Sequence, residues 1–264
     1  MNKVLPYQTS TASDSLPKRA CRSKLKLGVF VLSVSLVTLI LWLLVLWGVG
    51  SYRVISNDPA VWQSSIDALN QQKPVNFSNT GSTANPVIFV GSSSIRLFQQ
   101  LESIFNSETV LRRGFGGAKI NDVAYYKQDL ILDHNPKLVV FYIGVNDLLY
   151  SDYNTVLEPA EKLFRLISEL RSHLPQTPMV LLAQRPTSYH EVNTTIAKYN
   201  AEVQKYALST YGVYYIDPNN ALMSDGSKLN DIYMHWDGLH LSSEGYLAWG
   251  NAIHAQLAQK NLIQ

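Results

Sequence analysis

The chain has 264 residues, of which 46% are hydrophobic and 16% are charged. This composition supports a buried core and excludes disorder for most of the chain, and the length fits one large or two small domains. The single cysteine excludes a disulfide framework and a cysteine-based zinc site. Residues 1–26 carry six basic residues and one acidic residue, which leaves 16 basic and 19 acidic residues in the remainder. A nucleic-acid binder would carry its excess of basic residues on the folded part, so nucleic acid is excluded as a partner.

An uncharged run of 23 residues extends from Leu27 to Val49. As a helix it would reach about 34 Å, enough for a hydrocarbon core of about 30 Å. A cleaved signal peptide is the alternative, but its apolar region would normally be only about 7–15 residues long. Because the basic residues precede the run, residues 1–26 are predicted to be a cytoplasmic tail and residues 27–49 a transmembrane anchor. The rest of this single-pass protein would then lie outside the cytoplasmic membrane.

The chain after the anchor has the pattern of one α/β domain. Residues 50–85 are predicted to hold a juxtamembrane helix at 58–72 and a polar, turn-rich linker at 76–85. Beyond them, five apolar runs predict strands at 86–90, 108–113, 137–144, 178–184 and 213–217. Helix-length segments lie at 94–106, 119–133, 156–173, 191–208 and 243–259. Apolar strands separated by helices indicate a parallel sheet buried on both faces, so residues 86–264 are predicted to form a doubly wound three-layer α/β/α domain with a central five-stranded parallel sheet.

Chemically unusual residues follow the strands of this predicted sheet. The segments have the sequences GSSS, GFGG, GVND and DGLH, and they are Gly91–Ser94, Gly114–Gly117, Gly144–Asp147 and Asp237–His240. The first three follow successive strands and the fourth directly precedes the last helix. Ligands of such sheets bind beyond the carboxyl ends of the strands, so the four segments are expected to meet at one edge.

A serine, a histidine and a carboxylate are the components of a nucleophilic hydrolase. Ser93 is the candidate nucleophile, His240 the candidate base, and Asp237 the acid that orients the base. The backbone N–H groups of Ser93 and Gly117 and the side-chain amide of Asn146 would form an oxyanion hole. This chemistry needs no metal and no organic cofactor. Taken singly, each segment also fits a simple turn, a helix cap or a surface histidine, and it is their order and placement that favour an active site.

These segments resemble the four blocks of the SGNH hydrolases, also called the GDSL lipase/esterase family, over roughly residues 86–258. The stretch from Asp237 to Tyr246 is especially similar to the last block of that family. The resemblance implies a flavodoxin-like SGNH fold and assigns the block residues to Ser93, Gly117, Asn146, Asp237 and His240. Ser92 occupies the place of the family's aspartate.

The resemblance and the apolar run together predict a membrane-anchored serine esterase or lipase-type hydrolase that cleaves carboxylic esters through an acyl-enzyme. Its substrate would be a lipid, an acylated glycan or a small ester. Two alternatives stay open, an envelope O-acyltransferase that uses the same acyl-enzyme and a non-catalytic anchored binding module. His235 and Trp236, which precede Asp237, are expected either to line the site or simply to pack beside it.

Overall fold

The computed structural model describes residues 18–72, 75–76, 85–149, 156–224 and 228–264. The chain divides into two compact units, Met1–Ser51 and Tyr52–Gln264. Residues 1–17 of the predicted basic tail and residues 77–84 of the predicted linker lie outside the described residues.

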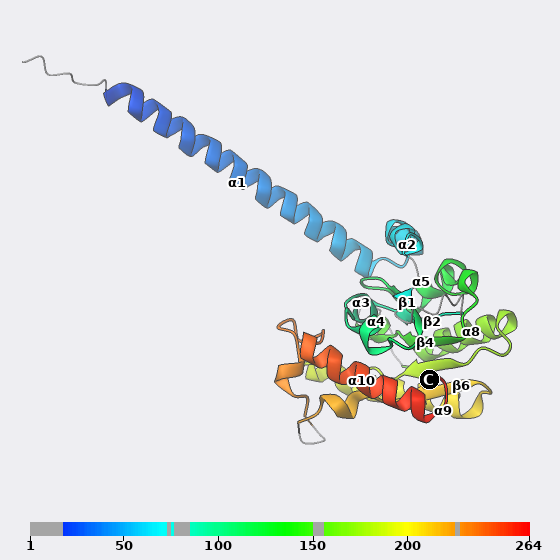
Figure 1. Cartoon of the computed structure of the whole chain (residues 1–264). Helices are drawn as coiled ribbons and strands as arrows, with labels where there is room; N and C mark the ends of the chain where they lie inside the picture. Colours follow the sequence, from blue (N-terminus) through cyan, green and yellow to red (C-terminus); the bar gives the residue numbers. More distant parts are fainter. Residues whose placement is uncertain (1–17, 73–74, 77–84, 150–155, 225–227) are drawn as a thin grey trace, which may run out of the picture. The chain divides into compact units, whose positions relative to one another are not determined.

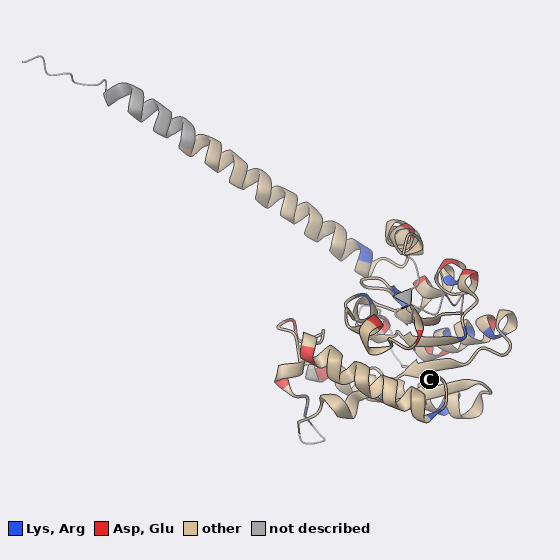
Figure 2. Ribbon diagram, viewed as in Figure 1, with Lys and Arg blue, Asp and Glu red and all other residues tan. Residues whose placement is uncertain are grey.

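The first unit consists of most of helix α1 (Lys18–Ile55), which is coloured blue in Figure 1. The most apolar window of 18 residues in its segment Val29–Ile55 has a mean hydropathy of 2.9, and none of that window is buried. Figure 2 shows no charged residue in the described side chains of α1 before Arg53. Within the described residues, α1 is therefore the one helix long and apolar enough to cross a membrane, although a signal sequence would satisfy the same criteria.

The second unit is built on a sheet with the strand order β1-β3-β2-β4-β5-β6. The strands are β1 (Val75–Asn76), β2 (Val87–Gly91), β3 (Thr109–Gly114), β4 (Leu138–Tyr142), β5 (Met179–Leu182) and β6 (Val213–Ile216). Strands β2 to β6 pair in parallel, which confirms the predicted five-stranded parallel sheet. The two-residue β1 adds an antiparallel edge that the sequence did not predict.

Helices and short turns connect the strands. The α-helices of this unit are α2 (Gln63–Asn70), α3 (Ser93–Arg96), α4 (Leu101–Ile104), α5 (Ile120–Tyr125), α6 (Lys127–Leu130), α7 (Val145–Leu149), α8 (Leu157–His173), α9 (His190–Ser209) and α10 (Ser243–Gln259). The 3-10 turns are η1 (Pro59–Trp62), η2 (Leu132–His134), η3 (Asn219–Leu222) and η4 (Asp231–Tyr233).

Alternating side chains of the strands divide the interior into two cores. In β2, Ile88 and Val90 join one core, and Val87 and Phe89 join the other. Buried residues of α2, α5, α6, α8 and α9 complete the first core, and residues of α3, α4 and α10 complete the second. The sheet thus lies between two helical layers, which confirms the predicted three-layer architecture.

Two of the predicted long helices are interrupted. The segment 94–106 forms α3 and α4 separated by a turn. At this turn the Arg112 side chain of β3 donates hydrogen bonds to the carbonyls of Arg96 (3.3 Å) and Phe98 (3.0 Å), and the Phe98 carbonyl also accepts from the Leu101 N–H (3.3 Å). The Arg96 carbonyl, at the end of α3, thus has a partner outside the helix. The segment 119–133 is broken at Tyr126 and Ile131, whose backbone torsions leave the helical region.

Candidate active site

The first serine-containing segment forms a sharp turn between β2 and α3. A Cβ atom on Gly91, at the end of β2, would lie 2.1 Å from the Tyr142 carbonyl oxygen of the neighbouring strand β4, so only glycine fits at this position. Ser92 follows in an extended conformation, and its carbonyl accepts hydrogen bonds from the N–H groups of Ile95 and Arg96, both at 3.1 Å. Ser93 therefore begins the helix and remains partly exposed, whereas its two serine neighbours are buried.

The aspartate-histidine segment is held in a tight turn before α10. The His235 N–H donates to the His240 carbonyl at 2.9 Å, and the Gly238 N–H donates to the His235 carbonyl at 3.0 Å. Gly238 has a φ of +66°, a left-handed conformation that favours glycine. Within the turn, Asp237 Oδ1 accepts hydrogen bonds from the N–H groups of Leu239 (2.9 Å) and His240 (2.8 Å). The backbone N–H groups of the two residues that close the turn thus fix the orientation of the Asp237 carboxylate.

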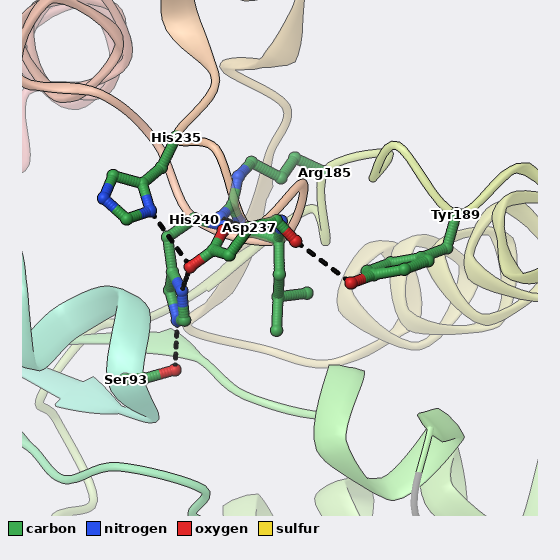
Figure 3. A network of polar contacts seen from close by, with 7 residues as sticks. Ser93, Arg185, Tyr189, His235, Asp237 and His240 are labelled. Carbon is green, nitrogen blue, oxygen red and sulfur yellow. Dashed lines mark hydrogen bonds and ion pairs between the residues drawn. The ribbon is translucent and has the colours of Figure 1, made fainter.

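The structure brings Ser93, His240 and Asp237 into one hydrogen-bonded chain (Figure 3). The Ser93 Oγ lies 2.8 Å from His240 Nε2, and His240 Nδ1 lies 2.7 Å from Asp237 Oδ2. The tautomer with a proton on Nδ1 satisfies both contacts, because Nδ1 then donates to the carboxylate and Nε2 accepts from the serine hydroxyl. The nucleophile and base candidates, which are 147 residues apart along the chain, therefore meet as the sequence predicts, with the acid candidate beside the base.

The surroundings of Asp237 favour its ionised form. Burial alone would raise the pKa of this carboxyl group. The hydrogen bonds from the His240 N–H, the His240 ring and the Leu239 N–H outweigh burial, and they hold the pKa of Asp237 well below its ordinary value. A negative charge therefore stays beside the imidazole, where it orients the ring and stabilises a positive charge on it.

The two other predicted site segments reach the same edge of the sheet. In the parallel register Gly91 is paired with Gly114 on one side and with Tyr142 on the other, so the chain leaves all three strands at one level. Beyond this level, the buried Asn146 amide donates a hydrogen bond to the carbonyl of Ala118, the residue after Gly117, at 2.9 Å. The structure thus brings Asn146 to the Gly117 loop, and their role in an oxyanion hole stays a prediction.

Sequence reasoning missed several contacts of the Asp237 segment. His235 Nδ1 lies 3.1 Å from Asp237 Oδ2, the same oxygen that His240 contacts, and the Tyr189 hydroxyl donates to the Asp237 carbonyl at 3.0 Å. Figure 3 shows His235 and Tyr189 on opposite sides of Asp237. The buried Arg185 donates to the Leu239 carbonyl. The one sequence signal for Arg185 is its position just after an apolar strand.

A small cavity of about 220 Å³ borders the carboxylate and imidazole. Its lining includes Leu97, Gln99 and Gln100 as well as His235 and His240. Trp236, next to Asp237, is 89% exposed and is not among the residues that line this cavity, and its ring centre lies 5.4 Å from that of His235. Among the residues that the structure describes, no group of three or more histidine, cysteine, aspartate or glutamate side chains is arranged to hold a metal ion.

Comparisons with known proteins identify the family. Residues 81–248 match the GDSL-like Lipase/Acylhydrolase family, whereas no curated protein sequence matches the chain significantly. A protein from Streptococcus pneumonia provisionally named as a platelet activating factor is 22% identical, with a TM-score of 0.64 over 83% of this chain and 99% of its own. A GDSL-like lipase from Bacteroides thetaiotaomicron is 17% identical, with a TM-score of 0.60 over 77% of this chain and 98% of its own. An acetylxylan esterase from Geobacillus stearothermophilus is 16% identical, with a TM-score of 0.53 over 65% of this chain and 93% of its own.

Similarity to solved structures at these identities reflects a common fold. The fold and the family match together define the class of protein, which is a carboxylic ester hydrolase. The chain belongs to the GDSL-like lipase/acylhydrolase family, whose match extends over more than half of its length. The resemblance seen in the sequence is thereby confirmed.

Proposed function

We propose that the protein is a membrane-anchored serine esterase that uses Ser93, His240 and Asp237 as a catalytic triad. The observation that supports this proposal is the continuous chain of hydrogen bonds from Ser93 Oγ through the imidazole to the Asp237 carboxylate, with distances of 2.8 and 2.7 Å. The catalytic mutants of the Geobacillus acetylxylan esterase replace a serine, an aspartate and a histidine, and the last two lie three positions apart. Asp237 and His240 have the same spacing.

The reaction proceeds through an acyl-enzyme. His240 Nε2 takes the proton of the Ser93 hydroxyl while Oγ attacks the ester carbonyl, and the imidazolium then gives that proton to the departing alcohol. Water attacks the acyl-enzyme in the same way and releases the acid and free Ser93. Asp237 stays ionised throughout and stabilises the imidazolium, in agreement with its lowered pKa.

Three donors would stabilise the negative charge that develops on the ester oxygen. They are the N–H groups of Ser93 and Gly117 and the side-chain amide of Asn146. One proton of the Asn146 amide is held by the Ala118 carbonyl, which fixes the orientation of the amide and leaves its second proton for the oxyanion. Gly117 has a φ of +77°, so its backbone follows a path that most other residues avoid.

The membrane part of the proposal rests on α1. We infer that residues 1–26 are a cytoplasmic tail, 27–49 an uncleaved anchor, 50–85 a juxtamembrane segment and 86–264 the hydrolase domain. The apolar character of Val29–Ile55 and the six basic residues that precede it support this arrangement. The catalytic domain then lies outside the cytoplasmic membrane, where its substrate is an ester of a lipid, a glycan or a small alcohol. Protease accessibility of the domain in intact and in opened cells tests the orientation.

Labelling with a fluorophosphonate probe tests the catalytic proposal. The probe reacts with activated serine hydroxyls, so the detergent-solubilised full chain is expected to be labelled and to hydrolyse p-nitrophenyl acetate. Ser93→Ala is expected to lose both properties while remaining folded. Ser92→Ala is the matched control, because the Ser92 Oγ is buried and has no hydrogen-bond partner among the described residues. Labelling of Ser93→Ala but not of Ser92→Ala would show that the nucleophile is wrongly assigned.

A further inference from the structure

Arg185 is a buried cation at the carboxyl end of β5. It is 2% exposed, and within the described residues no aspartate or glutamate forms an ion pair with it. A buried charge without a paired carboxylate destabilises a fold unless other groups compensate it. The contacts of Arg185 therefore indicate what the fold gains from keeping it.

Two partners hold the guanidinium. Its Nη1 donates to the Tyr142 hydroxyl at 2.8 Å, and the central carbon of the guanidinium, Cζ, lies 5.9 Å from the centre of the Tyr142 ring. Its Nη2 donates to the carbonyl of Leu239. Arg185 thus connects the end of strand β4, where Tyr142 lies, with the turn that carries Asp237 and His240.

The Leu239 carbonyl belongs to the same peptide group as the His240 N–H. That N–H donates to Asp237 Oδ1 at 2.8 Å. The peptide between Leu239 and His240 is therefore fixed at both ends, by Arg185 at its oxygen and by Asp237 at its nitrogen. Because a peptide group is planar, rotation of this group would break both hydrogen bonds together.

Tyr142 links the same arrangement to the serine side of the site. It is paired with Gly91 in the parallel sheet, and Gly91 has no space for a Cβ atom against the Tyr142 carbonyl. Ser93 follows Gly91 by two residues. A continuous path of contacts thus runs from the Ser93 turn through Tyr142 and Arg185 to the peptide of His240.

We propose that Arg185 is a positioning residue for ester hydrolysis, which sets the approach of His240 to Ser93 by holding the Leu239–His240 peptide. This inference rests on the proposed function. Burial disfavours the charged guanidinium, but Tyr142, Tyr246 and Asp237 compensate and raise the pKa of Arg185 above its ordinary value. The guanidinium therefore stays charged throughout the pH range of the assay.

Substitution of Arg185 by methionine tests the proposal, with Arg113→Met as the matched control. Arg113 is also buried, at 1% exposure, and also donates to a backbone carbonyl of a remote segment, that of Leu69. The other hydrogen-bond partner of its side chain is the His134 ring, and no hydrogen bond among the described residues joins Arg113 or His134 to Ser93, Asp237 or His240. Both variants lose a buried guanidinium, so both are expected to lose thermal stability to a similar degree. Only Arg185→Met is expected to lose activity.

The expected result is a kcat of Arg185→Met about 10²-fold below wild type with little change in KM, because a small misplacement of a catalytic group has an effect of this size. A merely structural role would lower Tm without lowering kcat at temperatures where the variant is folded. Arg113→Met is expected to retain the wild-type kcat and KM.

A second variant keeps the test decisive should Arg185→Met fail to fold. Tyr142→Phe preserves the buried ring and removes only the hydroxyl that accepts from Arg185, and a lowered kcat with an unchanged KM is expected. Equal kcat values for Arg185→Met and Arg113→Met, or an unchanged kcat in Tyr142→Phe, would overturn the proposal while leaving the triad intact. If wild type itself neither hydrolyses p-nitrophenyl acetate nor reacts with the fluorophosphonate, the proposed function fails and this inference fails with it.

Discussion

The three serines at 92–94 show how local backbone geometry selects one residue from a run of identical side chains. Ser92 and Ser94 are buried, at 1% and 4% exposure, because the chain turns from strand to helix between them. Ser93 occupies the first position of α3, and its hydroxyl contacts His240. The family resemblance assigned Ser93 as the nucleophile from its place in the motif. The backbone torsions give the physical reason why Ser93, and neither of its neighbours, has a partly exposed hydroxyl.

Asn146→Ala tests the oxyanion hole. The amide contacts charge that develops only in the transition state, so kcat is expected to fall by about 10²–10³-fold with a smaller effect on KM. Steady-state kinetics with p-nitrophenyl acetate measures both constants, and a melting curve reports the loss of the hydrogen bond to Ala118. A change confined to KM would remove Asn146 from the oxyanion hole.

Asp237→Asn tests the role of the charged carboxylate. The asparagine amide would replace an acceptor of the imidazole N–H by a donor, so kcat is expected to fall by about 10³–10⁴-fold. The native pKa of Asp237 is depressed, so the stability that its charge contributes is present above the ordinary aspartate pKa and is lost as pH falls toward the lower native value. Asp237→Asn should therefore be less stable than wild type near neutral pH, and the difference in Tm should shrink in strong acid. A constant difference at all pH values would contradict this assignment.

The contacts of the site that could not be predicted from the sequence share one property. Arg185 and Tyr189 contact the site through backbone carbonyls, and the contact of His235, a residue that was itself expected at the site, is a second one to an oxygen that His240 already binds. Such contacts depend on the tertiary path of loops and leave no spacing pattern in the chain. Ser93, Asp237 and His240 were predictable because each has a chemical type and a position next to a recognisable element.

At the scale of elements, buried strands and long helices were predictable and short helices were not. A strand such as β4, LVVFY, is apolar along its whole length because both of its faces are covered. Helices α8 and α10 end close to the predicted limits of 156–173 and 243–259. The turn between α3 and α4 accepts hydrogen bonds from the Arg112 side chain of β3, a contact that no local pattern in 94–106 could indicate.

Asp147 connects two of these short helices and provides a stability prediction. It lies in α7, is 1% exposed, and accepts a hydrogen bond from the Ile120 N–H at the start of α5 at 3.1 Å. Burial raises the pKa of Asp147 to about 7. The native state therefore holds a proton between about pH 4 and pH 7 that the unfolded state releases, so this group lowers stability as pH rises through that range.

Asp147→Asn should remove this dependence, because asparagine keeps an oxygen for the Ile120 N–H and does not ionise. The Tm of the variant relative to wild type is expected to increase from pH 5 to pH 8, by about 2–4 °C for each kcal/mol in a domain of this size. Calorimetry at a series of pH values measures the difference. A difference that is independent of pH would indicate that Asp147 is ionised in the native state over the whole range.

At the scale of the whole molecule, the site could be located because all five main strands run parallel. Their carboxyl ends share one edge, so segments that follow different strands must approach one another. The same reasoning could not place the end of α1 and the residues that directly follow it. Residues 54–57 were assigned to a stretch outside the hydrolase domain, yet they belong to the second compact unit.

Two contacts connect this segment with the predicted oxyanion region. The Lys119 ammonium, on a residue that is 4% exposed, donates to the Ser56 carbonyl and to the Asn57 side chain, both at 3.1 Å. A Cβ atom on Gly117 would lie 2.8 Å from Val54, so Val54 packs directly on this glycine. A buried ammonium that loses its acceptors is strongly destabilising.

Two truncated proteins distinguish an anchor that only tethers from a segment that also builds the fold. A fragment that begins at Tyr52 retains both contacts, so it is expected to be soluble and to hydrolyse p-nitrophenyl acetate as fast as the solubilised full chain. A fragment that begins at Asp58 loses Val54 and the acceptors of Lys119, so it is expected to have a lower Tm and a lower kcat. Equal Tm and kcat in the two fragments would show that residues 52–57 have no part in the hydrolase fold. Low activity of both fragments in the folded state would instead give α1 a direct role in building the site.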